Sequence, residues 1–373
     1  MSPHSLAVRV LADPQAAAPT TEAGWDLLVR QARRAGLLPR VATVLHDAGV
    51  TAPAAAQRHL DVARALAAVQ REEVLREVRL LMRTLAPLAV PVVLLKGAAY
   101  AVGGFAPSQA RLFADIDILV PKERLGEVEA LLMTCGWATT SLSAYDQRYY
   151  RRWMHELPPM VHTQRQTTLD IHHNILPLTA RQVPDARLLF AAARPVDDVP
   201  GLFVPAPEDL VLHSLCHLLH NDDLRHALRD LSDVDLLLRD FGREPGFWSR
   251  LQDRAQALRL QRPLADGLRQ AHRVFATPMP EDLRRGGPGV KRGGLRHALL
   301  DALWRHGLQP QHASCETRAT GAARLALYVR AHWLRMPPLL LAAHLTVKAL
   351  GLHEWRQRPR PVERPAAADA VVR

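Results

Sequence analysis

Two aspartates separated by one residue, Asp115 and Asp117, are the side chains best placed for chemistry in this 373-residue sequence. They border and enter the apolar run 116–120, which predicts a β-strand, and residues two apart in a strand point to the same face. Two carboxylates held close together repel one another unless a cation lies between them. Carboxylates and substrate phosphate oxygens are the usual ligands of Mg²⁺. The pair therefore predicts a Mg²⁺ site, with a solvated strand edge as the alternative.

The surroundings of this pair favour the metal site. The β-branched and aliphatic run 92–95 predicts a buried strand that stops at a Lys-Gly turn. Arg111 stands four residues before the first aspartate, and a further acidic strand at 168–172 carries Asp170. The sequence thus offers a cationic turn, an arginine and a third carboxylate around one predicted sheet.

Taken as a set, four motifs resemble a known family. They are Leu-Leu-Lys-Gly at 94–97, Arg111, Asp-Ile-Asp-Ile-Leu-Val at 115–120 and Leu-Asp-Ile-His-His at 169–173. The set is similar to nucleotidyltransferase-fold proteins of the DNA polymerase β type, and most similar to the bacterial uncharacterised nucleotidyltransferase family. The likeness covers residues 22 to 260. It implies an α+β fold, in which a small mixed β-sheet core is flanked by N-terminal and C-terminal helical domains.

The resemblance also implies a reaction and its catalytic residues. Asp115, Asp117 and Asp170 would hold two Mg²⁺ ions, with Mn²⁺ as a substitute, and Asp170 would take the proton of the attacking hydroxyl. A nucleoside triphosphate, ATP in the first instance, would donate its NMP to an acceptor hydroxyl and release pyrophosphate. For Asp170 the alternative is a strand-end carboxylate paired with an arginine. The acceptor's identity is open, because one fold serves many acceptors.

The phosphate-binding turn departs from the superfamily pattern. Ala98 follows Gly97, where serine or glycine is usual, so no hydroxyl is available. The resemblance therefore assigns nucleotide binding to Lys96, Gly97 and Arg111. The departure also keeps an alternative open, a catalytically degenerate nucleotide- or RNA-binding protein on the same fold.

Histidines form a second group of candidate residues. His172 shares a strand face with Asp170 and could orient it, contact substrate or simply pack. His213, His217 and His220 fall on one face of a helix predicted to start at Pro207. Histidines at that spacing could bind zinc. However, no glutamate follows His213, and the sequence shows no separate further ligand. We favour buried, hydrogen-bonded histidines, with His213 and His217 as possible substrate contacts.

Three other segments imitate functional motifs. Asp233 and Asp235 repeat the Asp-x-Asp spacing, but in a helical pattern, where they point about 200° apart and cannot share one metal ion. Residues 284–294 are glycine-rich and basic, but lack the strand and Lys-Ser/Thr of a P-loop. Residues 143–153 combine tyrosine, tryptophan and arginine, which suits either ligand stacking or an ordinary amphipathic element.

Composition limits the class of protein. The net charge of +11 is uneven, since residues 241–373 hold 23 Lys and Arg against 10 Asp and Glu. This basic third could bind RNA or an anionic surface, or be a solvated helical face. No apolar run is long enough to span a membrane, and no signal peptide is recognised. Three widely spaced cysteines favour a reducing, cytoplasmic location.

The pattern along the chain predicts seven segments. They are a mobile leader at 1–20, an N-terminal helical region at 21–88, the nucleotidyltransferase α/β core at 89–205, a helical substrate-side domain at 206–280, a basic Gly-rich linker at 281–295, C-terminal helices at 296–356 and a disordered tail at 357–373.

Overall fold

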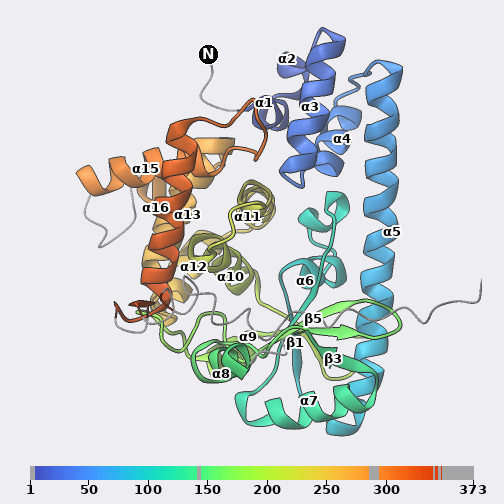
Figure 1. Cartoon of the computed structure of the whole chain (residues 1–373), viewed down its shortest axis with the longest axis vertical. Helices are drawn as coiled ribbons and strands as arrows, with labels where there is room; N and C mark the ends of the chain where they lie inside the picture. The colour runs from blue at the N-terminus through green and yellow to red at the C-terminus, as the bar shows by residue number, and fades with distance from the viewer. Residues whose placement is uncertain (1–4, 141–143, 285–293, 339–340, 343–345, 347–373) are drawn as a thin grey trace, which may run out of the picture.

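A computed structural model describes residues 5–140, 144–284 and 294–338, together with 341, 342 and 346. A seven-stranded mixed sheet lies among many helices, which confirms the predicted α+β class (Figure 1). The sheet order is β3-β4-β5-β2-β1-β7-β6. Its strands are β1 Val92–Leu95, β2 Ile116–Leu119, β3 Trp137–Thr139, β4 Met160–His162, β5 Thr168–His172, β6 Arg194–Pro195 and β7 Leu202–Val204.

The centre of the sheet holds the strands that carry the candidate aspartates. β1 and β2 run antiparallel and are joined through α6 (Lys96–Val102) and a 3₁₀ segment (Ala106–Ala110). β2 and β5 run parallel, whereas β4 and β5 are antiparallel neighbours. All residues of β1 and β2 are buried, including Asp117 in the otherwise apolar β2.

The N-terminal helices build a second, smaller hydrophobic core. α3 (Glu22–Arg34), α4 (Leu38–Asp47) and the first half of α5 (Ala54–Leu85) form it. α5 extends along one side of the molecule, and its second half joins the main core beneath the sheet (Figure 1). The 32 residues of α5 lie within the region 21–88 that the sequence predicts to be helical.

The predicted mobile leader is wrong for residues 5–20. α1 (Leu6–Ala12) and α2 (Pro14–Ala17) form there, and Ala7 and Val10 are fully buried in the smaller core. Ser5 and Asp13 cap the two helices with their side chains. Burial against α3 and α4 supplies the stability that such short helices lack alone. Residues 1–4 lie outside the described part.

The remaining helices have the bounds α7 Leu125–Thr134, α8 Ala144–Trp153, α9 Ala186–Ala192, α10 Pro207–His220, α11 Ala227–Phe241, α12 Phe247–Ala257, α13 Gln261–Phe275, α14 Glu281–Arg284, α15 Leu295–Gly307 and α16 Arg318–Arg335. Among them, α7 packs against α5, α10 packs against α11, α12 and α13, and α16 packs against α10 and α15. The predicted linker at 281–295 is helical at both ends, because α14 occupies 281–284 and α15 begins at 295. Residues 285–293 of this linker and the predicted tail at 357–373 fall outside the described residues. Across the described chain, every helix is too short or too polar to span a bilayer.

Candidate active site

Asp117 and Asp170 occupy matching positions on neighbouring strands. In the parallel pairing of β2 with β5, the Cα of Asp117 lies opposite the Cα of Asp170. Side chains at paired positions project from the same face of a sheet, so the two carboxyl groups share one face. The two residues are 53 positions apart in sequence and become neighbours because β2 and β5 pair in parallel, with α7, β3, α8 and β4 in the connection between them.

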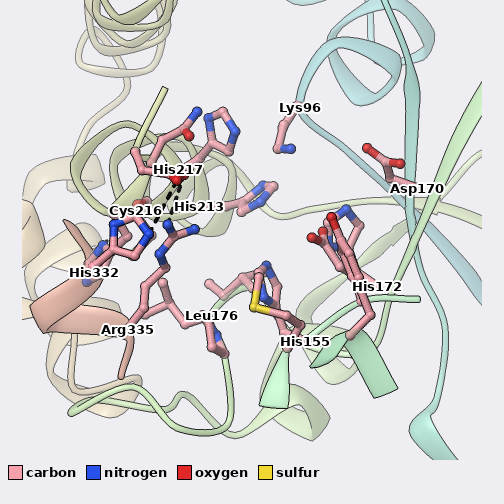
Figure 2. A pocket seen from close by; sticks show the side chains of 18 of the residues that line it. Lys96, His155, Asp170, His172, Leu176, His213, Cys216, His217, His332 and Arg335 are labelled. Atoms are coloured by element: carbon pink, nitrogen blue, oxygen red, sulfur yellow. Dashed lines mark hydrogen bonds and ion pairs between the residues drawn. The ribbon is translucent and has the colours of Figure 1, made fainter. Parts of the chain in front are cut away.

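Asp115 and Asp170 line one cavity, whereas Asp117, which is 1% exposed, lies behind its wall and is not a lining residue. A cavity of about 380 Å³ is lined by Lys96, Asp115, Asp170 and His172 on the sheet side, and by residues of α10 opposite (Figure 2). The pKa of Asp115 is raised by the negative charge of Asp117 and by burial. The three carboxyl groups therefore lie within electrostatic range of one another.

Asp170 has the surroundings that most favour binding of a cation. Burial, followed by the charge of Asp117, raises the pKa of Asp170 to about 7. Its Oδ1 is buried without a hydrogen-bond partner. A buried unpaired carboxylate oxygen is costly, and a divalent ion would satisfy it. An all-carboxylate donor set of this kind fits Mg²⁺ or Mn²⁺.

Asp117 is held ionised by two donors. Lys96 Nζ lies 2.7 Å from Asp117 Oδ1, and His172 Nε2 lies 2.9 Å from the same oxygen. Burial alone would raise the pKa of Asp117, but the Lys96 charge and the His172 hydrogen bond hold it well below its usual range. Both bonds end on Oδ1, which leaves Oδ2 as the oxygen suited to bind a metal ion.

The turn after β1 brings Lys96 to this position. Lys96 has φ = 44°, in the left-handed region that few residues other than glycine adopt. Glycine suits position 97 because a side chain there would be crowded. A Cβ atom would lie 3.1 Å from Phe113 Cδ1 and 3.4 Å from Arg111 Nε. Ala98 is buried, so its methyl group packs in the core and presents no polar atom to the cavity.

Arg111 lies against this turn, but its charged group is engaged elsewhere. Its guanidinium forms a buried ion pair with Asp233, lies 3.9 Å from Asp230 Oδ1 and stacks over the Tyr100 ring at 5.7 Å. Arg111 does not line the cavity that holds the carboxylates. Arg40 Nη2 lies 2.7 Å from Asp233 Oδ1, so two arginines share this carboxylate.

The second Asp-x-Asp pair diverges, as its helical pattern predicted. Asp233 faces the two buried arginines, whereas Asp235 binds Arg239 at 2.9 Å and accepts a hydrogen bond from Thr277 at 2.6 Å. Both residues belong to α11. Their partners differ completely, so the pair has a structural role in joining α11 to its neighbours.

The α10 histidines form the wall opposite the sheet. His213 and His217 line the cavity, and burial together with the nearby Lys96 charge lowers the pKa of both, to about 3 for His217. They are therefore neutral and can exchange hydrogen bonds with a ligand. His220 Nδ1 lies 3.0 Å from the Cys216 carbonyl oxygen. Within the described residues, these histidines do not form a three-ligand metal cluster.

Several cavity residues had no recognisable signal in the sequence. His155 and Glu156 follow α8 and reach the site through an isolated bridge between Glu156 and His172. Arg335 comes from α16 and pairs with Asp222 at 2.8 Å on the cavity wall. No periodicity marks such positions, because loops and distant helices bring them together. Tyr149 and Tyr150 of the aromatic segment also line the cavity, which agrees with the ligand-contact alternative.

Comparison with known proteins gives one positive result. A model of the uncharacterised nucleotidyltransferase family matches residues 21–276, and the chain belongs to that family. The match includes β1 to β7 and all three aspartates. Membership supports nucleotidyl transfer in general, without identifying a substrate. A search of curated proteins found no match.

Proposed function

We propose that this protein is a Mg²⁺-dependent nucleotidyltransferase that moves an NMP, AMP from ATP in the first instance, to an acceptor hydroxyl and releases pyrophosphate. The observation that carries the proposal is the in-register placement of Asp117 beside Asp170, with Asp115 on the same cavity. Three carboxylates, one with a buried unpaired oxygen, are suited to bind divalent cations.

Asp115, Asp117 and Asp170 would hold the metal ions. Two Mg²⁺ ions, when bound, would stabilise the entering and leaving oxygens of an in-line displacement. The pKa of Asp170 near 7 means that cation binding displaces a proton from this carboxyl group at neutral pH. Asp170 is thus the carboxylate most suited to accept the proton of the acceptor hydroxyl.

Lys96 and the backbone of Gly97 would face the triphosphate. Lys96 carries its charge at the edge of the carboxylate cluster, where it can offset phosphate charge once a metal ion neutralises Asp117. Arg111 supports the Gly97 turn from behind through its pair with Asp233. Direct contact between Arg111 and phosphate stays a prediction.

The acceptor would occupy the cavity between the sheet and α10. His172 fixes Asp117, and the neutral His213 and His217 offer hydrogen bonds to an uncharged polar ligand. The wall is polar and encloses space for a small molecule or for the end of a larger one. An acceptor bearing hydroxyl groups fits these donors and acceptors.

The test uses the full-length protein, MgCl₂, an extract of the native host and ATP labelled at either the α- or the γ-phosphorus. Nucleotidyl transfer places the α-label on the acceptor and releases the γ-label in pyrophosphate, whereas phosphoryl transfer places the γ-label on the acceptor and leaves the α-label in ADP. Each of the other three nucleoside triphosphates is compared in the same way.

The matched variants are Asp115→Asn and Asp117→Asn, with Asp240→Asn as the control on an exposed position. Transfer should fall on the order of 10³-fold in the first two, as for loss of a group that stabilises transition-state charge, and stay unchanged in the control. Equal turnover in all three would reject the assignment. Tight Mg²⁺-dependent ATP binding without any labelled product would instead favour a binding protein.

A further inference from the structure

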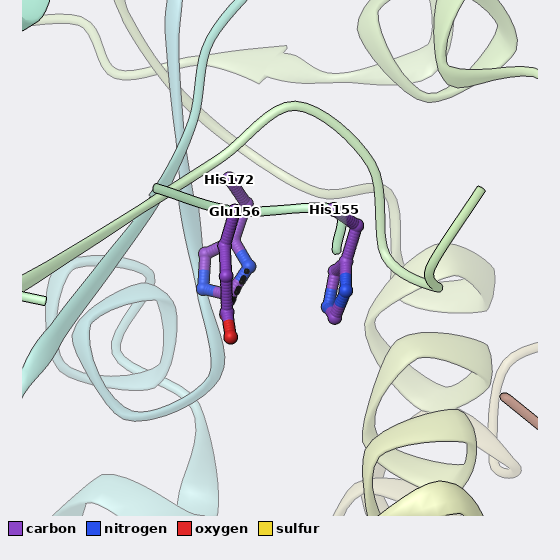
Figure 3. A group of neighbouring side chains, drawn as sticks. All are labelled: His155, Glu156 and His172. Atoms are coloured by element: carbon purple, nitrogen blue, oxygen red, sulfur yellow. Dashed lines mark ion pairs between the residues drawn. The ribbon is translucent and has the colours of Figure 1, made fainter. Parts of the chain in front are cut away.

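Beside the aspartates, three side chains form a cluster of a different chemical type. His155, Glu156 and His172 each place one ligand atom within 4.8 Å of the other two (Figure 3). The backbone holds them in place, because Leu157 N–H donates to the Ile171 carbonyl at 2.8 Å and His173 N–H donates to the His155 carbonyl at 2.8 Å. Two imidazoles and a carboxylate are thus pre-positioned at the C-terminal end of β5.

The orientation of His172 is fixed by its hydrogen bond to Asp117. An ionised carboxylate only accepts hydrogen bonds, so the His172 Nε2 atom, 2.9 Å from Asp117 Oδ1, carries the proton. The other nitrogen, Nδ1, lies 3.1 Å from Glu156 Oε2. A proton on Nδ1 satisfies this contact in the metal-free protein, and a metal ion bound by the two groups would take the place of that proton.

His155 supplies a second imidazole with an unused nitrogen. Its Nδ1 is buried and has no hydrogen-bond partner. The His155 and His172 rings lie 5.3 Å apart between centroids, on the same side of the cavity. Burial, together with the positive charges of His172 and Lys96, lowers the pKa of His155 well below its usual value. A proton on His172 Nδ1 satisfies Glu156, but His155 Nδ1 still lacks a hydrogen-bond partner.

We propose that His155, Glu156 and His172 bind a divalent transition-metal ion of the Zn²⁺ class, in a site separate from the Mg²⁺ aspartates. Nitrogen ligands favour such ions over Mg²⁺, which prefers oxygen. Asp117 orients His172 from the opposite ring nitrogen, the carboxylate–histidine–metal arrangement that tunes many metal sites.

The proposed site keeps a coordination position for a ligand. Three protein ligands and one open position characterise catalytic zinc sites, and all three residues line the cavity that also exposes Asp170. Resting on the proposed function, we assign this ion the task of ligating a heteroatom of the acceptor and so orienting its hydroxyl toward Asp170. The metal site itself does not depend on that role.

The experiment measures Co²⁺ binding to chelator-stripped full-length protein, with excess Mg²⁺ present to fill the aspartate site and no nucleotide. Co²⁺ serves as the probe for Zn²⁺ because its visible ligand-field absorption reports nitrogen ligation. We expect one Co²⁺ per chain with such a band, displaced by one equivalent of Zn²⁺.

Two variants each remove one proposed ligand, and a third serves as the control. His155→Ala and Glu156→Gln should weaken Co²⁺ binding by more than about 100-fold, since even removal of an outer partner of a ligand costs 10- to 100-fold. His220→Gln, which alters a histidine on the same cavity but outside the cluster, should bind as the wild type does. Far-ultraviolet circular dichroism confirms that each variant is folded.

Two results would overturn the metal site. One is the absence of Co²⁺ binding above the Mg²⁺ background in folded wild-type protein. The other is binding that survives His155→Ala and Glu156→Gln but is lost in Asp115→Asn, which would place the ion at the aspartates. Because no triphosphate is present, failure here leaves the nucleotidyl-transfer assay unaffected, and failure of that assay leaves Co²⁺ binding interpretable.

Discussion

Asp117 and Asp170 lie side by side in register on parallel strands, yet their pKa values are displaced in opposite directions. Lys96 and His172 keep Asp117 ionised, whereas Asp170 faces the resulting negative charge without a hydrogen bond to its Oδ1. One carboxylate is therefore satisfied by the protein itself, and the other depends on a proton or a metal ion. This asymmetry determines how the stability of the protein should respond to pH, to Mg²⁺ and to substitution of each residue.

Asp170→Asn should stabilise the metal-free protein at alkaline pH. The folded-state pKa of Asp170, near 7, exceeds the ordinary value of 3.8, so the folded state binds the proton more tightly and loses stability as pH rises from about 4 to 7. The variant escapes this loss, which is at most about 4 kcal/mol. Urea unfolding in chelator at pH 5 and pH 8 measures the difference, which should be small at pH 5. A variant less stable than the wild type at pH 8 would contradict the assignment.

ATP should stabilise the protein only when Mg²⁺ is present, and more at pH 8 than at pH 6. A ligand at 100 times its Kd adds about 2.7 kcal/mol of stability. Protons compete with the cation for Asp170 below its pKa, so the gain should shrink toward acid pH. Differential scanning calorimetry measures the shift in Tm. Asp115→Asn is expected to lose the Mg²⁺-dependent part, and a pH-independent shift would argue against Asp170 as a ligand.

Lys96→Met should destabilise the metal-free protein, with Mg²⁺ restoring part of the loss. Asp117 is 1% exposed and would keep only His172 as its partner. Removing one member of a buried pair costs about 3–5 kcal/mol, and the value here should fall at the lower end because His172 remains. Urea unfolding with and without Mg²⁺ tests this, with the exposed Lys122→Met as the control. Insensitivity of the variant to Mg²⁺ would show that the cation does not replace the lysine charge.

Asp233→Asn should reduce stability without changing the Mg²⁺ requirement of transfer. Arg40 and Arg111 are both buried and share this carboxylate, so its loss leaves two guanidinium groups poorly paired, at a cost of about 3–5 kcal/mol. Denaturant unfolding measures the loss, and Asp240→Asn should lie within about 0.5 kcal/mol of wild type. A stable Asp233→Asn protein with an altered Mg²⁺ dependence would mean that the second Asp-x-Asp pair takes part in catalysis.

Short-range patterns predicted much of the site. Alternation in a strand was enough to place Asp115 and Asp117 together, and helical spacing was enough to separate Asp233 from Asp235. The partner of Arg111 could not be predicted, because a basic residue four positions before an aspartate fits phosphate binding and ion pairing equally well. The ordered helices at 5–17 were missed for a similar reason, since their stability comes from burial against α3 and α4.

By itself, the sequence determined the central strands β1, β2 and β5, the helical N-terminal region and the acidic residues of the core, because backbone periodicity and apolar patterning are local properties. Only the tertiary structure decided that Asp170 stands opposite Asp117, that Lys96 and His172 meet on one oxygen, and that His155 and Glu156 complete a cluster beside them. Strand register and an isolated bridge set those contacts. Both depend on how distant segments pack, which no spacing along the chain encodes.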